Sequence, residues 1–424
     1  DNLKIRLSYG SLGNQQIGYY DFIQTVTTKG SMSDYSFDGT TLGQHATVSD
    51  PVSGNQTWEK VVSKNLGLDL NMFRNRLSLT ADFYIRDTKG ILGKGKSLPS
   101  IYGADEPQVN SNNLRTKGYE LVLGWRDSFE LAGSAFSYGI TGSFSDYTAK
   151  YTKCDNPSGL IGDPYVGKKY GEIWGYKVDG LFRTDEEAAE YASRIDLSTV
   201  AAGYYSATGG YGKRVGVGDM SYLELNGDDT VSAGKGTLED PGDRRVIGNS
   251  SPRYQYGATL NFSWYGFDVS VFVQGIGRLD WYPGADNLRF WGPYCRPYAT
   301  FIPKNFMSRV WSEENTDAYF PRARAYTSLN STQGTAYYTN DRYLQNLAYC
   351  RLKNLTIGYT IPRRLTSKVG IKECRIYFSG ENLATWSALE SDFLDPEQAA
   401  ADSDKKSNVY PWCKTYSVGL NLTF

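Results

Sequence analysis

The segment RYQYGATLNFSW, residues Arg253–Trp264, decides the fold class because its side chains alternate in polarity. Apolar side chains occupy the even positions, and polar or small ones occupy the odd positions between them. Successive side chains of a β-strand point to opposite faces, so this segment has one apolar and one polar face. Tyr416–Phe424 repeats the pattern at the end of the chain. In a water-soluble sandwich the apolar face would be core, whereas in an outer-membrane barrel it would meet lipid and the polar face would line the lumen.

Segments of this kind recur along the whole chain. They are Leu3–Tyr9, Leu66–Met72, Leu77–Ile85, Tyr119–Trp125, Phe136–Ile140, Tyr254–Trp264, Phe267–Val273, Leu355–Ile361, a weaker one around Ile376–Phe378, and Tyr416–Phe424. These make about ten strands, most of them near the roughly 9–11 residues that cross a bilayer at a tilt. The sequence therefore predicts an all-β, antiparallel fold.

The connections between these segments alternate between short and long. Short turns are expected at Phe73–Arg76, Asp127–Ser134, Tyr265–Asp268 and Arg363–Lys372, and long polar loops at Gly10–Thr57, Lys89–Leu114, Lys150–Ser251, Ile276–Ala348 and Thr385–Tyr410. A soluble sandwich has no reason to place every long loop at one end, but outer-membrane barrels have short periplasmic turns and long extracellular loops. We therefore predict a transmembrane β-barrel, with aromatic residues such as Trp264, Trp412, Tyr416 and Phe424 at the membrane interfaces.

Composition excludes several classes of function. The net charge is −1, from 45 basic and 46 acidic residues, which argues against a nucleic-acid partner. The chain has one histidine, His45, and five cysteines without a CxxC pair, so a zinc site or histidine-based catalysis is not expected. We predict that the protein is not an enzyme, although counting residues does not exclude a glycosidase that uses two carboxylates.

The first strand, Leu3–Tyr9, begins almost at residue 1, without a preceding Met or signal peptide. A ten-stranded sheet would leave two unpaired edges in lipid, which membranes do not tolerate. We therefore expect further strands before Asp1, so that residues 1–424 form the C-terminal portion of a larger barrel.

Several blocks of sequence together resemble one family. They are LKIRLSYGSLGNQQIGYY (Leu3–Tyr20), TWEKVVSKNLGLDL (Thr57–Leu70), YGEIWGYKVDGLF (Tyr170–Phe182), GDRRVIGNSSPRYQYG (Gly242–Gly257), YCRLKNLTIGYTIP (Tyr349–Pro362) and FSGENLATW (Phe378–Trp386). In this order, over nearly all of the chain, they resemble the SusC/RagA family of TonB-dependent outer-membrane transporters.

The resemblance implies a 22-stranded barrel closed by a plug domain, of which this chain supplies about ten C-terminal strands with long extracellular loops. It also implies import of oligosaccharides or peptides together with a SusD-like surface lipoprotein, driven by a TonB complex. The plug domain and the N-terminal strands are absent from this chain. A passive porin, an adhesin-like surface barrel, and a soluble all-β enzyme or lectin remain as alternatives.

The loop Gly277–Phe301 is the candidate for substrate contact because aromatic faces and charges suit sugars or peptide side chains. The candidate residues are Trp281, Tyr282, Trp291, Tyr294, Arg296 and Tyr298. The alternative is that these aromatics pack against one another or contact the lipoprotein.

The stretch ELNGDDTVSAGK, Glu224–Lys235, resembles a calcium-binding loop. Glu224, Asn226 and Asp228 supply oxygen atoms at alternate positions, which can surround a hard cation. The usual glycine at the sixth position is Asp229, and the usual acid at the twelfth is Lys235. A polar turn is therefore the alternative to structural calcium, and no other cofactor is expected.

Overall fold

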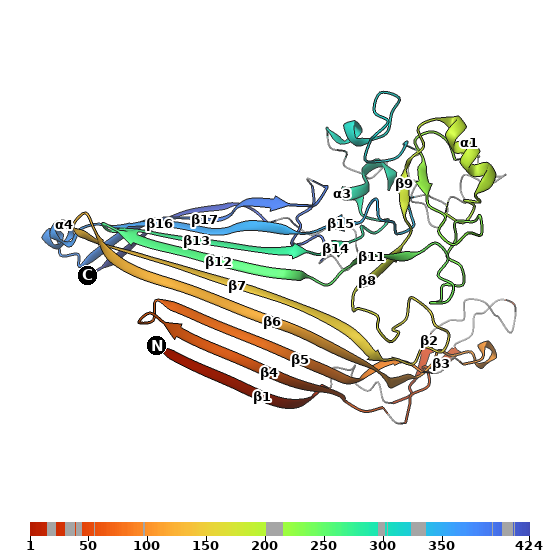
Figure 1. Cartoon of the computed structure of the whole chain (residues 1–424), viewed down its shortest axis with the longest axis horizontal. Helices are drawn as coiled ribbons and strands as arrows, with labels where there is room; N and C mark the ends of the chain where they lie inside the picture. The colour runs from red at the N-terminus through yellow and green to blue at the C-terminus, as the bar shows by residue number, and fades with distance from the viewer. Residues whose placement is uncertain are drawn as a thin grey trace.

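Ten antiparallel strands form one twisted sheet in which each pairs with the next long strand along the chain (Figure 1). They are β1 (Asn2–Asn14), β4 (Glu59–Met72), β5 (Leu77–Lys94), β6 (Gln108–Leu131), β7 (Ser134–Lys153), β12 (Arg253–Trp264), β13 (Phe267–Arg278), β16 (Tyr349–Thr360), β17 (Glu373–Ser387) and β18 (Thr415–Thr423). The structure is a computed structural model that describes residues 1–14, 23–29, 39, 45–54, 56–95, 98–200, 215–295, 302, 304–323, 336–391, 393–400, 410 and 412–424. Over these residues the sheet is open, with β1 and β18 as its edges. The predicted all-β fold with about ten strands is confirmed.

The connections between the long strands differ in length at the two ends of the sheet. Phe73–Arg76 joins β4 to β5, Ala132 and Gly133 join β6 to β7, and Tyr265 and Gly266 join β12 to β13. The two-residue turns have positive φ at both residues, which matches the right-handed twist of the flanking strands. The helices α4 (Arg363–Thr366) and η6 (Ser367–Val369) join β16 to β17 at the same end, called here the short-turn end (Figure 1). The opposite, long-loop end carries all the long connections, as predicted.

Most of the long strands extend beyond the segments that the sequence pattern indicated, and β5, β6 and β7 are the longest of them. β5 has 18 residues, β6 has 24 and β7 has 20, so the expected loop Lys89–Leu114 contracts to 95–107 and the expected turn Asp127–Ser134 contracts to two residues. Beyond the apolar segments these strands still pair, and Asp87 stands opposite Arg115. Cross-strand polar pairs maintain the ladder where alternation of apolar residues has ended.

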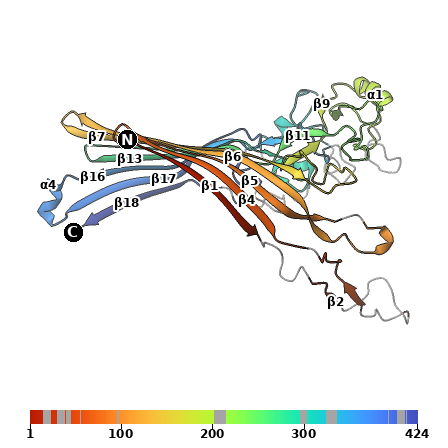
Figure 2. The same ribbon diagram turned by 60° about the horizontal axis from the view of Figure 1, so that its bottom comes forward.

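The long-loop end also contains small elements. Four two-stranded sheets are formed by β2 (Val26–Lys29) with β3 (His45–Val48), β8 (Glu172–Gly175) with β11 (Arg245–Asn249), β9 (Val178–Leu181) with β10 (Met220–Tyr222), and β14 (Asp280–Trp281) with β15 (Gln345–Asn346). The helices are α1 (Asp185–Arg194), α3 (Leu288–Trp291), η1 (Ser100–Tyr102), η2 (Gly292–Tyr294) and η3 (Phe306–Arg309). Figure 2 shows the β2 hairpin set apart from the group that contains α1, β9 and β11.

The main apolar core lies in these loops and not in the sheet. The described parts of 154–252 and 279–348 pack together around buried aromatic residues, and we call them the loop assembly. Phe182, Trp291, Tyr294, Phe320 and Tyr343 are each 2% exposed or less. The assembly therefore folds around its own interior beside the end of the sheet (Figure 1).

Two further features of the described residues concern cysteines and helices. All five cysteines are free, so the pairing that the sequence left open does not occur in this structure. Within the described ranges, no helix has the length and apolar character needed to cross a membrane.

Candidate functional site

One face of the sheet is apolar and open to its surroundings. The strand register aligns Leu7 with Leu66, and Leu260 with Val271. Leu7 is 80% exposed, Leu123 is 52% and Val418 is 79%. In the described residues no second layer encloses these side chains. An exposed apolar surface of this extent marks contact with a membrane or another protein.

Two rows of aromatic rings border this apolar face. Towards the long-loop end, Phe83, Tyr119, Phe144 and Tyr254 follow one another across four strands, with ring centroids 6.0 to 6.4 Å apart. Towards the short-turn end a second row contains Phe73, Trp125, Phe129, Phe136, Tyr138, Phe262, Phe267 and Tyr359. At about 3.3 Å per residue, Phe136 and Phe144 of β7 lie about 26 Å apart along the strand. With a strand tilt of about 40°, this is a band about 20 Å tall, close to that of outer-membrane barrels.

The opposite face is polar, and its charges are paired across strands. Arg6 of β1 bonds Asp69 of β4, with Nε 2.8 Å from Oδ2, and reaches Asp82 of β5, with Nη2 also 2.8 Å from Oδ2. Asn65 donates a further hydrogen bond to Asp82. One guanidinium binds two carboxylates, so these three side chains are hydrogen-bonded to one another and keep a net charge of about −1.

A glycine lies beneath each of two such ion pairs. Gly67 stands between Arg6 and Asp82 in the register, and a Cβ there would be 2.5 Å from Arg6 Cζ. Nearer the β18 edge of the sheet, Arg375 of β17 reaches Asp268 of β13 across β16. A Cβ on Gly358 of β16 would meet both partners. The missing side chain at each glycine lets an arginine span three strands.

A third cationic group fastens a loop to the polar face near the long-loop end. Arg351 of β16 is 2% exposed, and its Nη2 and Nη1 lie 2.7 Å from Asp395 and Glu397. Arg351 Nε donates to Thr385, and Lys353 also pairs with Glu397 at 2.8 Å. The segment 388–400 thus packs over the end of the polar face. We call these four charged residues, Arg351, Lys353, Asp395 and Glu397, the loop clamp.

The same segment also contacts the loop assembly. Leu389, Leu394 and Ala399 pack with Trp281 and Leu347, and Arg309 pairs with Glu390 at 3.2 Å. The segment therefore contacts both the polar face of the sheet and the loop assembly.

The predicted substrate-contact residues lie inside the loop assembly. Trp291 and Tyr294 are each 1% exposed and Trp281 is 9%, while Tyr282 donates to the carbonyl oxygens of Ala336 and Tyr338. Burial raises the pKa of Tyr282 well above its usual value. In this conformation the four residues pack within the protein, which is the alternative given from the sequence. Ligand contact by them stays a prediction. Arg296 and Tyr298 lie outside the described residues.

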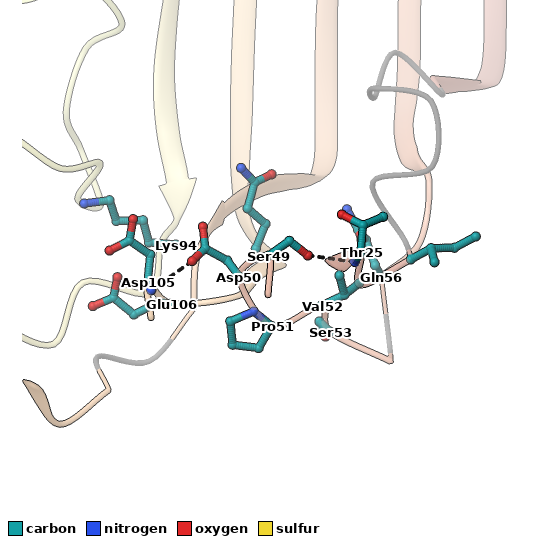
Figure 3. Close-up of a pocket in the computed structure, with 12 residues that line it drawn as sticks. Thr25, Ser49, Asp50, Pro51, Val52, Ser53, Gln56, Lys94, Asp105 and Glu106 are labelled. Atoms are coloured by element: carbon teal, nitrogen blue, oxygen red, sulfur yellow. Dashed lines mark hydrogen bonds between the residues drawn. The ribbon is translucent and has the colours of Figure 1, made fainter. Parts of the chain in front are cut away.

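A polar hollow is present on the other side of the long-loop end. It has a volume of about 590 Å³ and lies between the β2–β3 hairpin and the β5–β6 loop. Its lining includes Asp50, Lys94, Asp105, Glu106 and Thr25 (Figure 3). The backbone N–H of Asp105 donates to Asp50 Oδ1, and that of Thr25 donates to Ser49 Oγ. Its carboxylates and hydroxyls could bind sugar hydroxyls or the cationic groups of a peptide.

The stretch 224–228 forms a tight polar turn. Glu224 Oε1 accepts backbone N–H groups from Asn226, Gly227 and Asp228, and Asn226 Nδ2 donates to Asp228. No group of three or more His, Cys, Asp or Glu suited to a metal ion occurs in the described ranges. The candidate ligands serve the turn in this structure, and calcium binding stays a prediction.

Sequence reasoning did not identify the loop clamp. Asp395 and Glu397 lie 44 and 46 residues from Arg351, inside a loop without periodicity. The available signal was two cations, Arg351 and Lys353, within an otherwise uncharged strand.

The comparisons with known proteins agree with this architecture. No protein-family model matches the chain. TonB-dependent receptor P3 of Formosa agariphila is 25% identical over 443 residues, covering 99% of this chain and 39% of that relative. TonB-dependent receptor SusC of Bacteroides thetaiotaomicron is 21% identical over 439 residues, covering 100% of this chain and 38% of that relative.

Solved structures give the same result. The structure of the RagAB peptide transporter matches with a TM-score of 0.66 at 21% identity, over 100% of this chain and 41% of that chain. At this identity the likeness shows the fold. The chain spans about two-fifths of the length of the relatives and structures that it matches.

Proposed function

We propose that this chain, which belongs to the SusC/RagA-like TonB-dependent receptors, is the C-terminal barrel portion of an outer-membrane nutrient importer. The exposed apolar face, bounded by two aromatic rows, is the observation that carries the proposal. Such a face is stable against acyl chains and unstable against water. The remaining strands and a plug domain would precede Asp1 in the complete protein and complete the barrel.

The cargo would be an oligosaccharide or a peptide, and its route would pass along the polar face. The ion-paired charges there offer hydrogen-bonding groups without a strong net field, which suits a large polar solute. The hollow lined by Asp50, Asp105 and Glu106, and the end of the polar face beside the loop clamp, would be its first contacts. The chemistry of transport would be binding and release, without bond cleavage.

A SusD-like lipoprotein would cover the long-loop end, and a TonB complex would supply energy through the plug domain. The size of the loop assembly supports a partner at this end, because a passive pore needs no such structure. The passive porin and the adhesin-like barrel are the alternatives, and energy dependence of uptake separates them from the importer.

The test is growth and uptake in a strain that lacks the gene. We expect loss of growth on one class of oligomer, restored by the intact gene, and loss of labelled-oligomer uptake when a protonophore removes the proton gradient. Growth on glycans alone or on peptides alone would identify the cargo class. Unchanged growth and uptake on every candidate oligomer would remove the import proposal.

A further inference from the structure

Several lysines lie on the apolar face immediately beyond the aromatic row that is nearer the long-loop end. In the register, Lys64 and Lys117 stand on either side of Ile85, two residues past Phe83 towards the long-loop end. Further along are Lys60, Lys89, Arg115, Lys150 and Lys169, and all seven side chains are exposed. These seven residues form what we call the basic patch.

Two carboxylates within this region, those of Asp87 and Asp146, are neutralised by arginines. Arg115 Nε lies 2.6 Å from Asp87 Oδ1, and Arg253 binds Asp146 with two contacts of 2.6 Å. Glu172 accepts hydrogen bonds from the Tyr165 hydroxyl and from the backbone N–H of Lys169, and these neutral donors leave its negative charge in place. No ion pair joins a lysine of the basic patch to an acid in the described residues, so the seven cations, offset by Asp87 and Glu172, leave a net positive charge of about five.

Two pairs of lysines stand directly opposite each other on neighbouring backbone segments, where their like charges repel. Lys60 stands directly opposite Lys89, and Lys150 directly opposite Lys169. Like charges directly opposite across strands are destabilising. An anion bound between them would remove that repulsion.

A hollow adjoins the patch. Its volume is about 310 Å³, and its lining includes Lys169, Glu172, Tyr170 and Tyr254. Arg253 and Arg278 also line it, and they are ion-paired with Asp146 and Asp280. Arg253 also lies over the Tyr254 ring, with its Cζ 5.1 Å from the ring centroid. Cations, phenol groups and an aromatic face together suit a phosphorylated sugar headgroup.

We propose that the basic patch binds the phosphate groups of a phosphorylated glycolipid in the leaflet next to the long loops. This inference rests on the proposed membrane location, since that location sets the patch at the level of the lipid headgroups. The aromatic row marks the boundary between acyl chains and headgroups. Each basic residue near an anionic membrane surface strengthens binding, so several act together.

The experiment uses the whole transporter purified in a neutral detergent. Its probes are a glucosamine-disaccharide lipid that carries phosphate and the same lipid after the phosphate is removed, both measured by native mass spectrometry. The patch variant combines Lys64→Gln, Lys117→Gln, Lys150→Gln and Lys169→Gln. The control variant removes four exposed cations from the short-turn end, Arg363→Gln, Arg364→Gln, Lys368→Gln and Lys372→Gln.

We expect the wild type and the control variant to prefer the phosphorylated lipid, and the patch variant to lose at least ten-fold in affinity for it. Equal binding of both lipids by the wild type, or an equal loss in the control variant, would overturn the proposal. Displacement of the lipid by equimolar inorganic phosphate would also overturn the proposal. So would a patch variant that loses the lipoprotein partner but keeps its affinity for the phosphorylated lipid.

The failure of this inference is distinguishable from failure of the proposed function. Heat-modifiable migration and oligomer uptake are measured on the same variants. A transporter that assembles and imports oligomers but does not prefer the phosphorylated lipid would contradict only the basic-patch proposal. A protein that never enters a membrane would contradict both proposals.

Discussion

Arg351 Nη2 lies 2.7 Å from Asp395 Oδ2, although one residue belongs to the wall of the sheet and the other to the last long loop. The Arg351 side chain is 2% exposed and that of Asp395 is 10%. Glu397 and Lys353 complete the set, so each buried charge has a partner. The clamp therefore fixes segment 388–400 over the end of the polar face.

Replacement of Arg351 should release this segment. Arg351→Ala leaves Asp395 without a cation, and loss of one partner of a buried pair costs about 3–5 kcal/mol. We expect protease cleavage within 388–400 to become at least ten times faster in the purified transporter. The control is Arg183→Ala, whose pair with Asp317 is exposed and 3.9 Å long. Equal cleavage of wild type and Arg351→Ala would contradict the clamp.

A methyl group at Gly67 should break the ion pairs of Arg6. A Cβ there would occupy the position of the guanidinium, so Gly67→Ala displaces Arg6 from Asp69 and Asp82. Because these ion pairs are partly exposed, we expect only a small fall in the free energy of unfolding.

The effect of Gly67→Ala should disappear when Arg6 is absent. Gly67→Ala in an Arg6→Gln background should change stability no more than Gly142→Ala does, since a Cβ at Gly142 meets open space. Urea melts of the four variants make a double-mutant cycle. Additive effects of Gly67→Ala and Arg6→Gln would show that the glycine serves another purpose.

High pH should open the loop assembly. Burial raises the pKa of Tyr319 to about 12, and burial raises the pKa of Tyr343 well above its usual value. A phenol whose pKa is raised by folding favours the folded state below its unfolded pKa of about 10, and this contribution is lost as the pH rises from 10 to 12.

Fluorescence of the buried Trp291 can follow this transition. We expect a constant signal up to about pH 10 and a red shift between pH 10 and 12. The double variant Tyr319→Phe and Tyr343→Phe should move the midpoint upward. A red shift already complete at pH 9, or an unmoved midpoint in the double variant, would argue against control by these phenols.

Local periodicity predicted the sheet but not the contacts between loops. Alternation at Arg253–Trp264 fixes which side chains share a face, because strand geometry has a period of two. β5, β6 and β7 continue beyond their apolar segments, because polar cross-strand pairs such as Asp87 with Arg115 extend the hydrogen-bonded ladder without apolar alternation.

The burial of the loop aromatics could not be predicted from local sequence patterns. The residue types of Trp291 and Tyr294 favour a binding surface, and ligand contact by them stays a prediction. In this structure both are buried in the core of the loop assembly. Burial of a loop aromatic depends on segments far away in sequence, here around Phe320 and Tyr343, which one local pattern does not contain. For the same reason, the local pattern around Arg351 does not identify Asp395 and Glu397 as its partners.

The most direct test of the account concerns which face of β12 meets lipid. Spin labels are placed singly at residues 255 to 263 of the whole transporter in a bilayer, after its native cysteines are replaced. We predict that labels at the even positions, including Tyr256 and Leu260, relax with oxygen dissolved in lipid, and that labels at Thr259 and Asn261 relax with a water-soluble nickel chelate. If the even positions responded to neither agent, they would be buried against protein, and the membrane account would be contradicted.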